Sequence, residues 1–146
     1  MAPKAKGQLP LPVLIDTPVW QDYFRKEPHT FREVNALMDA GRVCCSDLGV
    51  AELLQTAETD EEIKIFQDFT HIFPLLRESP GAWVEAARLC FKLRRRGKQL
   101  SLRDCYMAVL ARDHRVLLYT TNKELVQARK AMAIGLGLFP KRKASA

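Results

Sequence analysis

The sequence has few histidines, no long apolar run and no pair of cysteines with C-x-x-C spacing. His29, His71 and His114 are too scattered to suggest a histidine metal site. No apolar run approaches the roughly 18 residues that a membrane-spanning helix needs, and residues 1–6 lack the apolar core of a secretory signal. We therefore expect a cytoplasmic protein without membrane association. The cysteines, which we expect to be reduced core residues, are Cys44, Cys45, Cys90 and Cys105.

The charge is distributed unevenly along the 146 residues, a length suited to one domain. Most of the net charge of +6 comes from residues 1–12 and 140–146, which contain lysine and arginine but no acid. We expect a flexible tail at 1–12, a folded domain at 13–139 and a basic tail at 140–146. Inside the domain there is one basic run, formed by Arg94, Arg95, Arg96 and Lys98.

Short apolar segments alternate with amphipathic helical patterns. Strands are expected at 13–16, 43–45, 72–76, 116–120 and 136–139. Helices are expected from the first strand to about Arg25, then at 28–40, 48–57, 59–71, 80–96, 101–112 and 123–133, with Ser79 capping the fifth and Pro80 as its first residue. This alternation predicts an α/β domain, with a parallel sheet of four or five strands covered by helices on both faces.

Four acidic or polar positions lie where such a sheet would gather them. Asp16 follows the first strand, Glu52 lies beside the apolar stripe of its helix, and Asp104 shares a helix face with small and apolar residues. The segment 120–124 follows the strand at 116–120. Each position also has a local alternative: Asp16 as a helix N-cap, Glu52 as a solvated side chain, Asp104 in a capping box with Ser101, and Asn122 or Thr121 as a cap with Glu124.

The carboxyl ends of parallel strands share one edge of a sheet, so these side chains are expected to converge there. Carboxylates brought together repel one another unless a cation neutralises them, and hard oxygen ligands favour Mg²⁺ or Mn²⁺. The basic run has two readings, as cations at a helix C-terminus or as phosphate contacts for RNA.

The sequence resembles the PIN-domain ribonucleases, most closely the VapC-like toxins of toxin–antitoxin pairs. The resemblance rests on four segments in the family's order: Val13 to Phe24, Val50 to Leu54, Leu100 to Ala111 and Leu117 to Asn122. It implies a three-layer PIN-like sandwich and an endoribonuclease dependent on Mg²⁺ or Mn²⁺. Asp16 and Asp104 would hold the metal, Glu52 would bind it or orient the water, and Thr17 would hydrogen-bond within the site.

The resemblance also implies an RNA substrate, a cognate antitoxin and a homodimer. One position departs from the family pattern, since Asn122 stands where an acid is usual, and Glu124 lies close enough in sequence to compensate. A supporting role is expected for Thr121 as well. Two alternatives remain beside the toxin: a catalytically weakened PIN-like module that binds RNA or protein, and a housekeeping RNA-processing nuclease.

Overall fold

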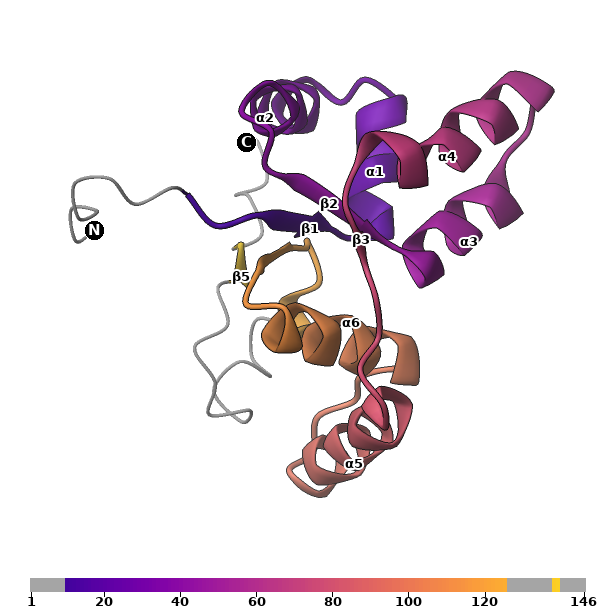
Figure 1. The fold of residues 1–146 in the computed structure, drawn as a ribbon. Helices are drawn as coiled ribbons and strands as arrows, with labels where there is room; N and C mark the ends of the chain where they lie inside the picture. Colours follow the sequence, from indigo (N-terminus) through magenta and orange to yellow (C-terminus); the bar gives the residue numbers. More distant parts are fainter. Residues whose placement is uncertain (1–9, 126–137, 140–146) are drawn as a thin grey trace.

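Strands and helices alternate through the computed structural model, which describes residues 10–125 and 138–139 (Figure 1). The elements are β1 (Val13–Ile15), α1 (Thr17–Phe24), α2 (Pro28–Asp39), β2 (Val43–Ser46), α3 (Asp47–Thr56), α4 (Asp60–Ile72), β3 (Leu75–Leu76), α5 (Ala82–Arg95), α6 (Leu102–Asp113), β4 (Leu117–Tyr119) and β5 (Leu138–Phe139). Most of both expected tails, and the greater part of the expected helix at 123–133, lie outside the described residues.

The strands form one parallel sheet in the order β3-β2-β1-β4-β5. The central strand β1 pairs with β2 through Val13 and Val43, and with β4 through Val13 and Leu117. Because every pairing is parallel, the strands end at the same edge of the sheet. The predicted α/β class and the parallel sheet are confirmed.

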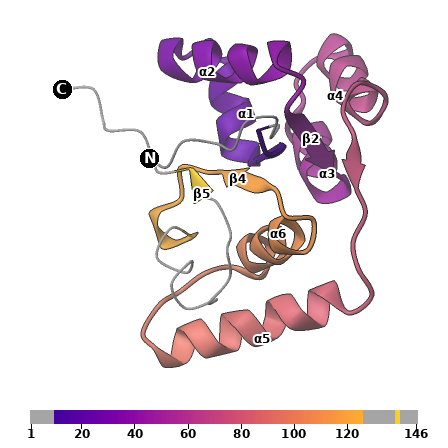
Figure 2. The same ribbon diagram turned by 60° about the vertical axis from the view of Figure 1, so that its left-hand side comes forward.

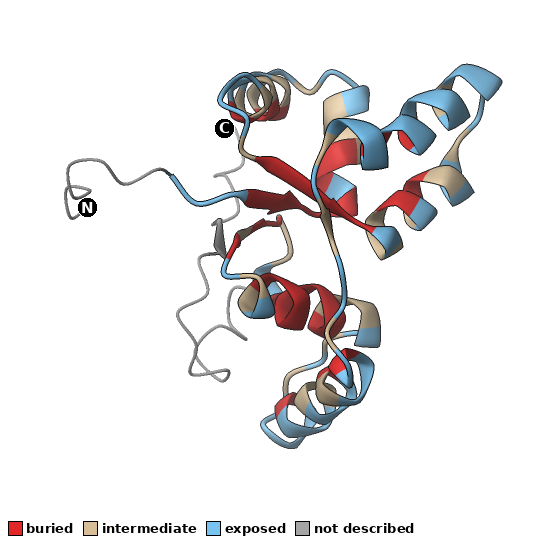
Figure 3. Cartoon of the chain, viewed as in Figure 1, coloured by how far each residue is buried: buried red, intermediate tan, exposed pale blue. Residues whose placement is uncertain are grey.

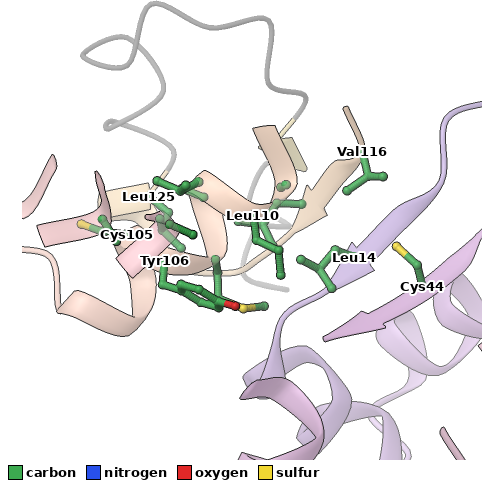
Figure 4. Close-up of a cluster of buried hydrophobic side chains, with 14 of the residues drawn as sticks. Leu14, Cys44, Cys105, Tyr106, Leu110, Val116 and Leu125 are labelled. Atoms are coloured by element: carbon green, nitrogen blue, oxygen red, sulfur yellow. The ribbon is translucent and has the colours of Figure 1, made fainter. Parts of the chain in front are cut away.

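Helices cover both faces of this sheet, giving three layers. Helices α1 to α4 lie on one face, whereas α6 lies on the other with α5 packed against it (Figures 1 and 2). Successive residues of a strand point to opposite faces. Leu14 and Cys44 accordingly join the core beneath α6 (Figure 4), while Val13 and Ile15 join the core of α1 to α4. All the residues of β1 and β2 are buried (Figure 3), which explains their near-continuous apolar sequence.

Helix α5 begins later than the sequence pattern suggested. Ser79 does not cap it and Pro80 is not its first residue, because the segment before Ala82 forms a turn closed by a hydrogen bond from the Ala82 N–H to the Ser79 carbonyl (3.1 Å). Gly81 has φ of 80° and ψ of 6°. Proline followed by a left-handed glycine is the sequence of a type II turn, and a helix cannot continue through that glycine.

The cysteines are free thiols, as expected. Burial raises the pKa of Cys44 to about 12 and that of Cys45 to about 11, with smaller contributions from Cys45 and from Asp47, respectively. The Sγ atoms of Cys90 and Cys105 lie 3.0 Å apart, linking α5 to α6. Within the described residues, no helix combines the length and apolar character needed to cross a bilayer.

Candidate functional site

Asp16 lies directly beyond the carboxyl end of β1, at the centre of the sheet edge. Its backbone N–H donates to the Tyr119 carbonyl (2.9 Å), which fixes it against β4. The side chain is 1% exposed. Its Oδ1 accepts from the Thr17 N–H (3.0 Å) and Arg103 Nη1 (2.8 Å), and its Oδ2 accepts from Thr120 Oγ1 (2.9 Å). The carboxylate therefore serves as the N-cap of α1 and also takes part in a side-chain cluster.

Glu52 reaches this cluster from α3. Its Oε1 accepts from Thr17 Oγ1 (2.7 Å) and from Arg103 Nη2 (2.6 Å), and its Oε2 accepts from Arg103 Nε (3.0 Å). This two-point contact between a carboxylate and a guanidinium is strong and directional. With a side chain 28% exposed, Glu52 is held in the cluster and is not a freely solvated surface residue.

Asp104 comes from the first turn of α6. The Ser101 side chain caps this helix, since its Oγ accepts from the Asp104 N–H (3.2 Å). The Asp104 carboxylate is 16% exposed, and its Oδ1 accepts from Arg103 Nη1 (2.9 Å) while its Oδ2 accepts from Asn122 Nδ2 (3.1 Å). The cap of α6 thus uses the backbone N–H of Asp104, and the carboxylate is left to contact Arg103 and Asn122.

The segment after β4 contributes two residues to the site. Thr120 Oγ1 donates to Asp16 and accepts from the Asn122 N–H (3.0 Å), and Asn122 contacts Asp104. Asn122 also caps the turn that follows, because its Oδ1 accepts from the Glu124 N–H (2.9 Å). Glu124 meets Asn122 through its backbone. Among the described contacts, the hydroxyl that binds Asp16 is that of Thr120, one residue before Thr121.

Arg103 is the residue at the centre of the cluster that sequence reasoning missed. Its guanidinium contacts Asp16, Glu52 and Asp104, and its Nη2 lies 3.3 Å from Thr17 Oγ1. Burial acts to lower the pKa of Arg103, but the hydrogen bonds to the carboxylates and the charge of Asp16 outweigh it and raise the pKa overall. The guanidinium therefore stays charged.

The formal charges in this cluster do not balance. Three carboxylates face one guanidinium, so positive charge is in deficit. In this arrangement, no group of three or more acidic, cysteine or histidine side chains among the described residues is spaced to hold a metal ion. Arg103 lies between the carboxylates, at the point toward which they converge.

A surface pocket opens onto these residues. Its lining includes Thr17, Glu52, Ser101, Arg103 and Asp104. A second pocket shares Ser101 with the first and is lined by Arg94 and Lys98 as well. Two members of the basic run therefore line a pocket next to the acidic one.

The basic run also ends a helix, as its alternative reading expected. Arg94 and Arg95 lie in the last turn of α5, with their guanidinium carbons 5.8 and 5.6 Å from the ring centre of Phe91, and Arg96 is the C-cap. Cations are favourable at this end of a helix. Helix capping and phosphate contact are compatible for this segment.

A parallel sheet between two layers of helices, with acidic side chains gathered at its strand ends, defines a class of α/β protein whose site lies at that edge. The sequence matches the PIN domain over residues 13–131, and the chain belongs to this family. PIN domains are nucleases that generally use divalent metal ions.

Solved structures support the same fold. The chain is similar to VapBC-1 from nontypeable Haemophilus influenzae, with 16% identity, a TM-score of 0.70, and coverage of 91% of this chain and 100% of that one. It is also similar to DNA-bound VapBC from Salmonella typhimurium, with 19% identity, a TM-score of 0.67, and coverage of 89% and 98%. A toxin–antitoxin complex from Klebsiella pneumoniae is similar too, with 18% identity, a TM-score of 0.67, and coverage of 90% of this chain and 99% of that one. No curated protein matches the sequence.

Proposed function

We propose that this protein is a metal-dependent endoribonuclease and the toxin of a toxin–antitoxin pair. The observation that carries the proposal is the meeting of Asp16, Glu52 and Asp104, from three separate elements, around one cationic group. A helix cap needs only a bond to its own backbone, whereas these three carboxylates share one guanidinium. Membership of the PIN domain family supplies the reaction class, hydrolysis of a nucleic acid backbone.

The donor atoms fit Mg²⁺ or Mn²⁺. Asp16 Oδ1 and Asp104 Oδ1 both point at the same nitrogen of Arg103, and hard divalent cations select carboxylate oxygens of this kind. In this proposal these two residues hold the ion. When bound, such an ion lowers the pKa of its water and stabilises negative charge on a phosphodiester.

The surrounding side chains keep the acids in place. Thr120 and the Thr17 N–H hold Asp16, the Thr17 hydroxyl holds Glu52, and Asn122 holds Asp104. We assign to Glu52 the role of orienting the attacking water, or of sharing in the binding of the ion. A residue fixed by several hydrogen bonds needs little reorganisation during the reaction, which is the usual basis of electrostatic catalysis.

Asn122 is expected to weaken the activity without abolishing it. Its amide donates to Asp104 where the family usually has a further acid, so the site has one negative charge fewer for a second ion. Supporting roles for Thr121 and Glu124 remain part of the proposal, although the contacts described above belong to Thr120 and to the Glu124 backbone.

RNA is proposed as the substrate. An acidic site repels a polyanion, so cations beside it are needed to bring the backbone in. Arg94 and Lys98 line the pocket that adjoins the acidic pocket at Ser101, and we assign Arg94, Arg95, Arg96 and Lys98 to phosphate contact. Replacing Arg94 and Arg95 with alanine should weaken RNA binding and flatten its salt dependence. If the salt dependence of RNA binding is unchanged, these residues act only as cations at the C-terminus of the helix.

A protein antitoxin and a homodimer complete the proposal. The similar structures from Salmonella typhimurium and Haemophilus influenzae are VapBC, and the one from Klebsiella pneumoniae is a toxin–antitoxin complex. We propose that this chain has a cognate antitoxin of its own, and that it acts in the cytoplasm, where its RNA substrates are.

The test is growth arrest on expression combined with cleavage of a mixed RNA pool with and without EDTA. Wild-type protein should arrest growth and cut RNA in the presence of Mn²⁺, and Asp16→Ala or Asp104→Ala should relieve both effects. Asp113→Ala is the matched control, because this aspartate lies on the same helix as Asp104 but pairs with Arg112 away from the site. Arrest by both site variants would refute the assignment.

Asn122 favours a second candidate, a PIN-like module that binds RNA or protein without cutting it. Protein that binds RNA but leaves it intact in excess Mn²⁺ would support that candidate. A housekeeping processing nuclease is the third possibility, and it differs from a toxin in having no small antitoxin gene beside its own.

A further inference from the structure

The two carboxylates proposed to hold the metal ion each point an oxygen atom, Oδ1, at the same nitrogen atom of Arg103. Asp16 presents Oδ1 to Arg103 Nη1 at 2.8 Å and Asp104 presents Oδ1 to the same atom at 2.9 Å. Their other oxygens accept from the neutral donors Thr120 and Asn122. The point where these carboxylates converge is therefore held by a guanidinium nitrogen.

A divalent ion cannot share this point with Arg103. Magnesium binds carboxylate oxygens at about 2.0–2.1 Å, which is well inside the separation between those oxygens and Nη1. An ion bridging Asp16 Oδ1 and Asp104 Oδ1 would overlap the guanidinium. Either the side chain leaves or the ion binds elsewhere.

The position of Arg103 in its helix gives it a way to leave. It lies in the first turn of α6, where the helix dipole disfavours a cation, so the carboxylates supply what holds it there. Its side chain is 23% exposed and lines the open pocket beside Glu52. A rotation about the side-chain bonds toward this pocket would release the guanidinium without any change in the backbone.

We propose that Arg103 is an internal counter-cation that occupies the convergence point of Asp16 and Asp104 in the metal-free protein and must be displaced before a divalent ion binds there. Arg103 thereby sets the metal concentration at which the site fills. This inference rests on the proposed function, since it concerns the same carboxylates.

Two effects follow from this competition. Without metal, Arg103 offsets the mutual repulsion of the three carboxylates and stabilises the fold. With metal, the ion must replace charge-assisted hydrogen bonds, so its apparent affinity is lower than the carboxylates alone would give. Removing the guanidinium should therefore lower the stability of the metal-free protein and tighten metal binding.

The test is a titration of the full chain with Mn²⁺, comparing wild type with Arg103→Met. Methionine keeps an unbranched apolar chain and removes every donor. We expect Arg103→Met to bind Mn²⁺ about tenfold more tightly or better, to melt at a lower temperature in EDTA, and to gain more than wild type when Mn²⁺ is added. Arg112→Met is the matched control, because Arg112 also lies on α6 and pairs with two acids, Glu85 and Asp113, outside the site. It should bind Mn²⁺ as wild type does.

The outcomes separate this inference from the proposed function. If wild type binds Mn²⁺, Asp16→Asn abolishes binding, and Arg103→Met binds no more tightly than wild type, the inference is wrong and the metal site stands. If neither wild type nor Arg103→Met binds Mn²⁺ at millimolar concentrations, both the metal site and the inference fall.

A second measurement is made on the wild-type protein, and a variant serves only to assign the signal. The Nε–H of Arg103 donates to Glu52 Oε2, and its NMR signal, assigned with Arg103→Lys, reports directly on the guanidinium. Adding Mg²⁺ to wild-type protein should shift this signal and speed its exchange with water. A signal that stays unchanged while the backbone amides around Asp16 respond to Mg²⁺ would overturn the proposal.

Discussion

Thr120→Val should destabilise the protein although the two side chains have nearly the same shape. Thr120 is fully buried, and its hydroxyl donates to Asp16 Oδ2 (2.9 Å) and accepts from the Asn122 N–H (3.0 Å). Valine replaces the hydroxyl with a methyl group, so no cavity forms. The change removes two hydrogen bonds and leaves a buried carboxylate oxygen without its donor.

The expected loss follows from the charge on Asp16. A hydrogen bond to a charged group contributes about 1.5–3 kcal/mol, and the Asn122 N–H, which is partly buried, adds up to about 1 kcal/mol. The extra methyl group returns part of this through burial of apolar surface. We expect the free energy of unfolding to fall by about 2 kcal/mol, and the melting temperature by roughly 6 °C for a domain of this size.

Urea and thermal unfolding followed by circular dichroism measure this loss. Thr70→Val is the control, because Thr70 is exposed on α4 and its hydroxyl makes only a long bond (3.4 Å) to a carbonyl of its own helix. A double-mutant cycle with Asp16→Asn should give a coupling of about 1 kcal/mol or more. If Thr120→Val unfolds within about 0.5 kcal/mol of wild type, the account of how Asp16 is held is wrong.

Three further predictions concern pH, the thiols and Asn122. Burial raises the pKa of the Cys44 thiol to about 12, and burial together with Glu78 raises that of Tyr106 to about 12. As pH rises, these groups therefore ionise in the unfolded chain before they ionise in the folded protein. The melting temperature of the reduced protein should fall above about pH 9, and it should fall less steeply in Cys44→Ala. Oxidation with diamide, which takes two electrons and two protons from the thiols, should join Cys90 to Cys105 in a disulfide, seen as a loss of two hydrogens by mass spectrometry; a protein that keeps all its thiols would contradict the 3.0 Å approach. Asn122→Asp replaces the amide donor with an acid facing Asp104, so it should raise cleavage or lower the Mn²⁺ needed, and an unchanged metal titration would count against this role.

The sheet and most helices could be predicted because their signals are local. The apolar strands and the amphipathic helices each bury a pattern that can be read from neighbouring residues, as Leu14 and its neighbours on β1 illustrate. The start of α5 was missed because Ser-Pro and Pro-Gly are both valid signals, and the preference of Gly81 for a left-handed conformation decided between them. The residues before Gly81 do not show which of the two signals determines the structure.

The site was partly predictable for a reason of topology. Parallel strands end at one edge, so acids that follow separate strands are brought together whatever their distance in sequence. The contact between Asp16 and Thr120, and not Thr121, depends on where β4 ends, since a shift of one residue reverses the side of the sheet that a side chain faces. Arg103 left no such signal, because an arginine beside an aspartate is common on any solvated helix.

The caps that were the local alternatives for Asp16 and Asp104 are compatible with a place in the site, whereas Glu52 is not the solvated side chain of its own alternative. Asp16 caps α1, holds Arg103 and accepts from Thr120 with one buried carboxylate, so Asp16→Ala removes structural and chemical contributions together. In Asp104 the two contributions are separate: the capping bond uses its backbone N–H, and only the site contacts use its carboxylate. Asp104→Ala therefore keeps the cap of α6, which makes loss of cleavage by this variant the stronger evidence for a chemical role.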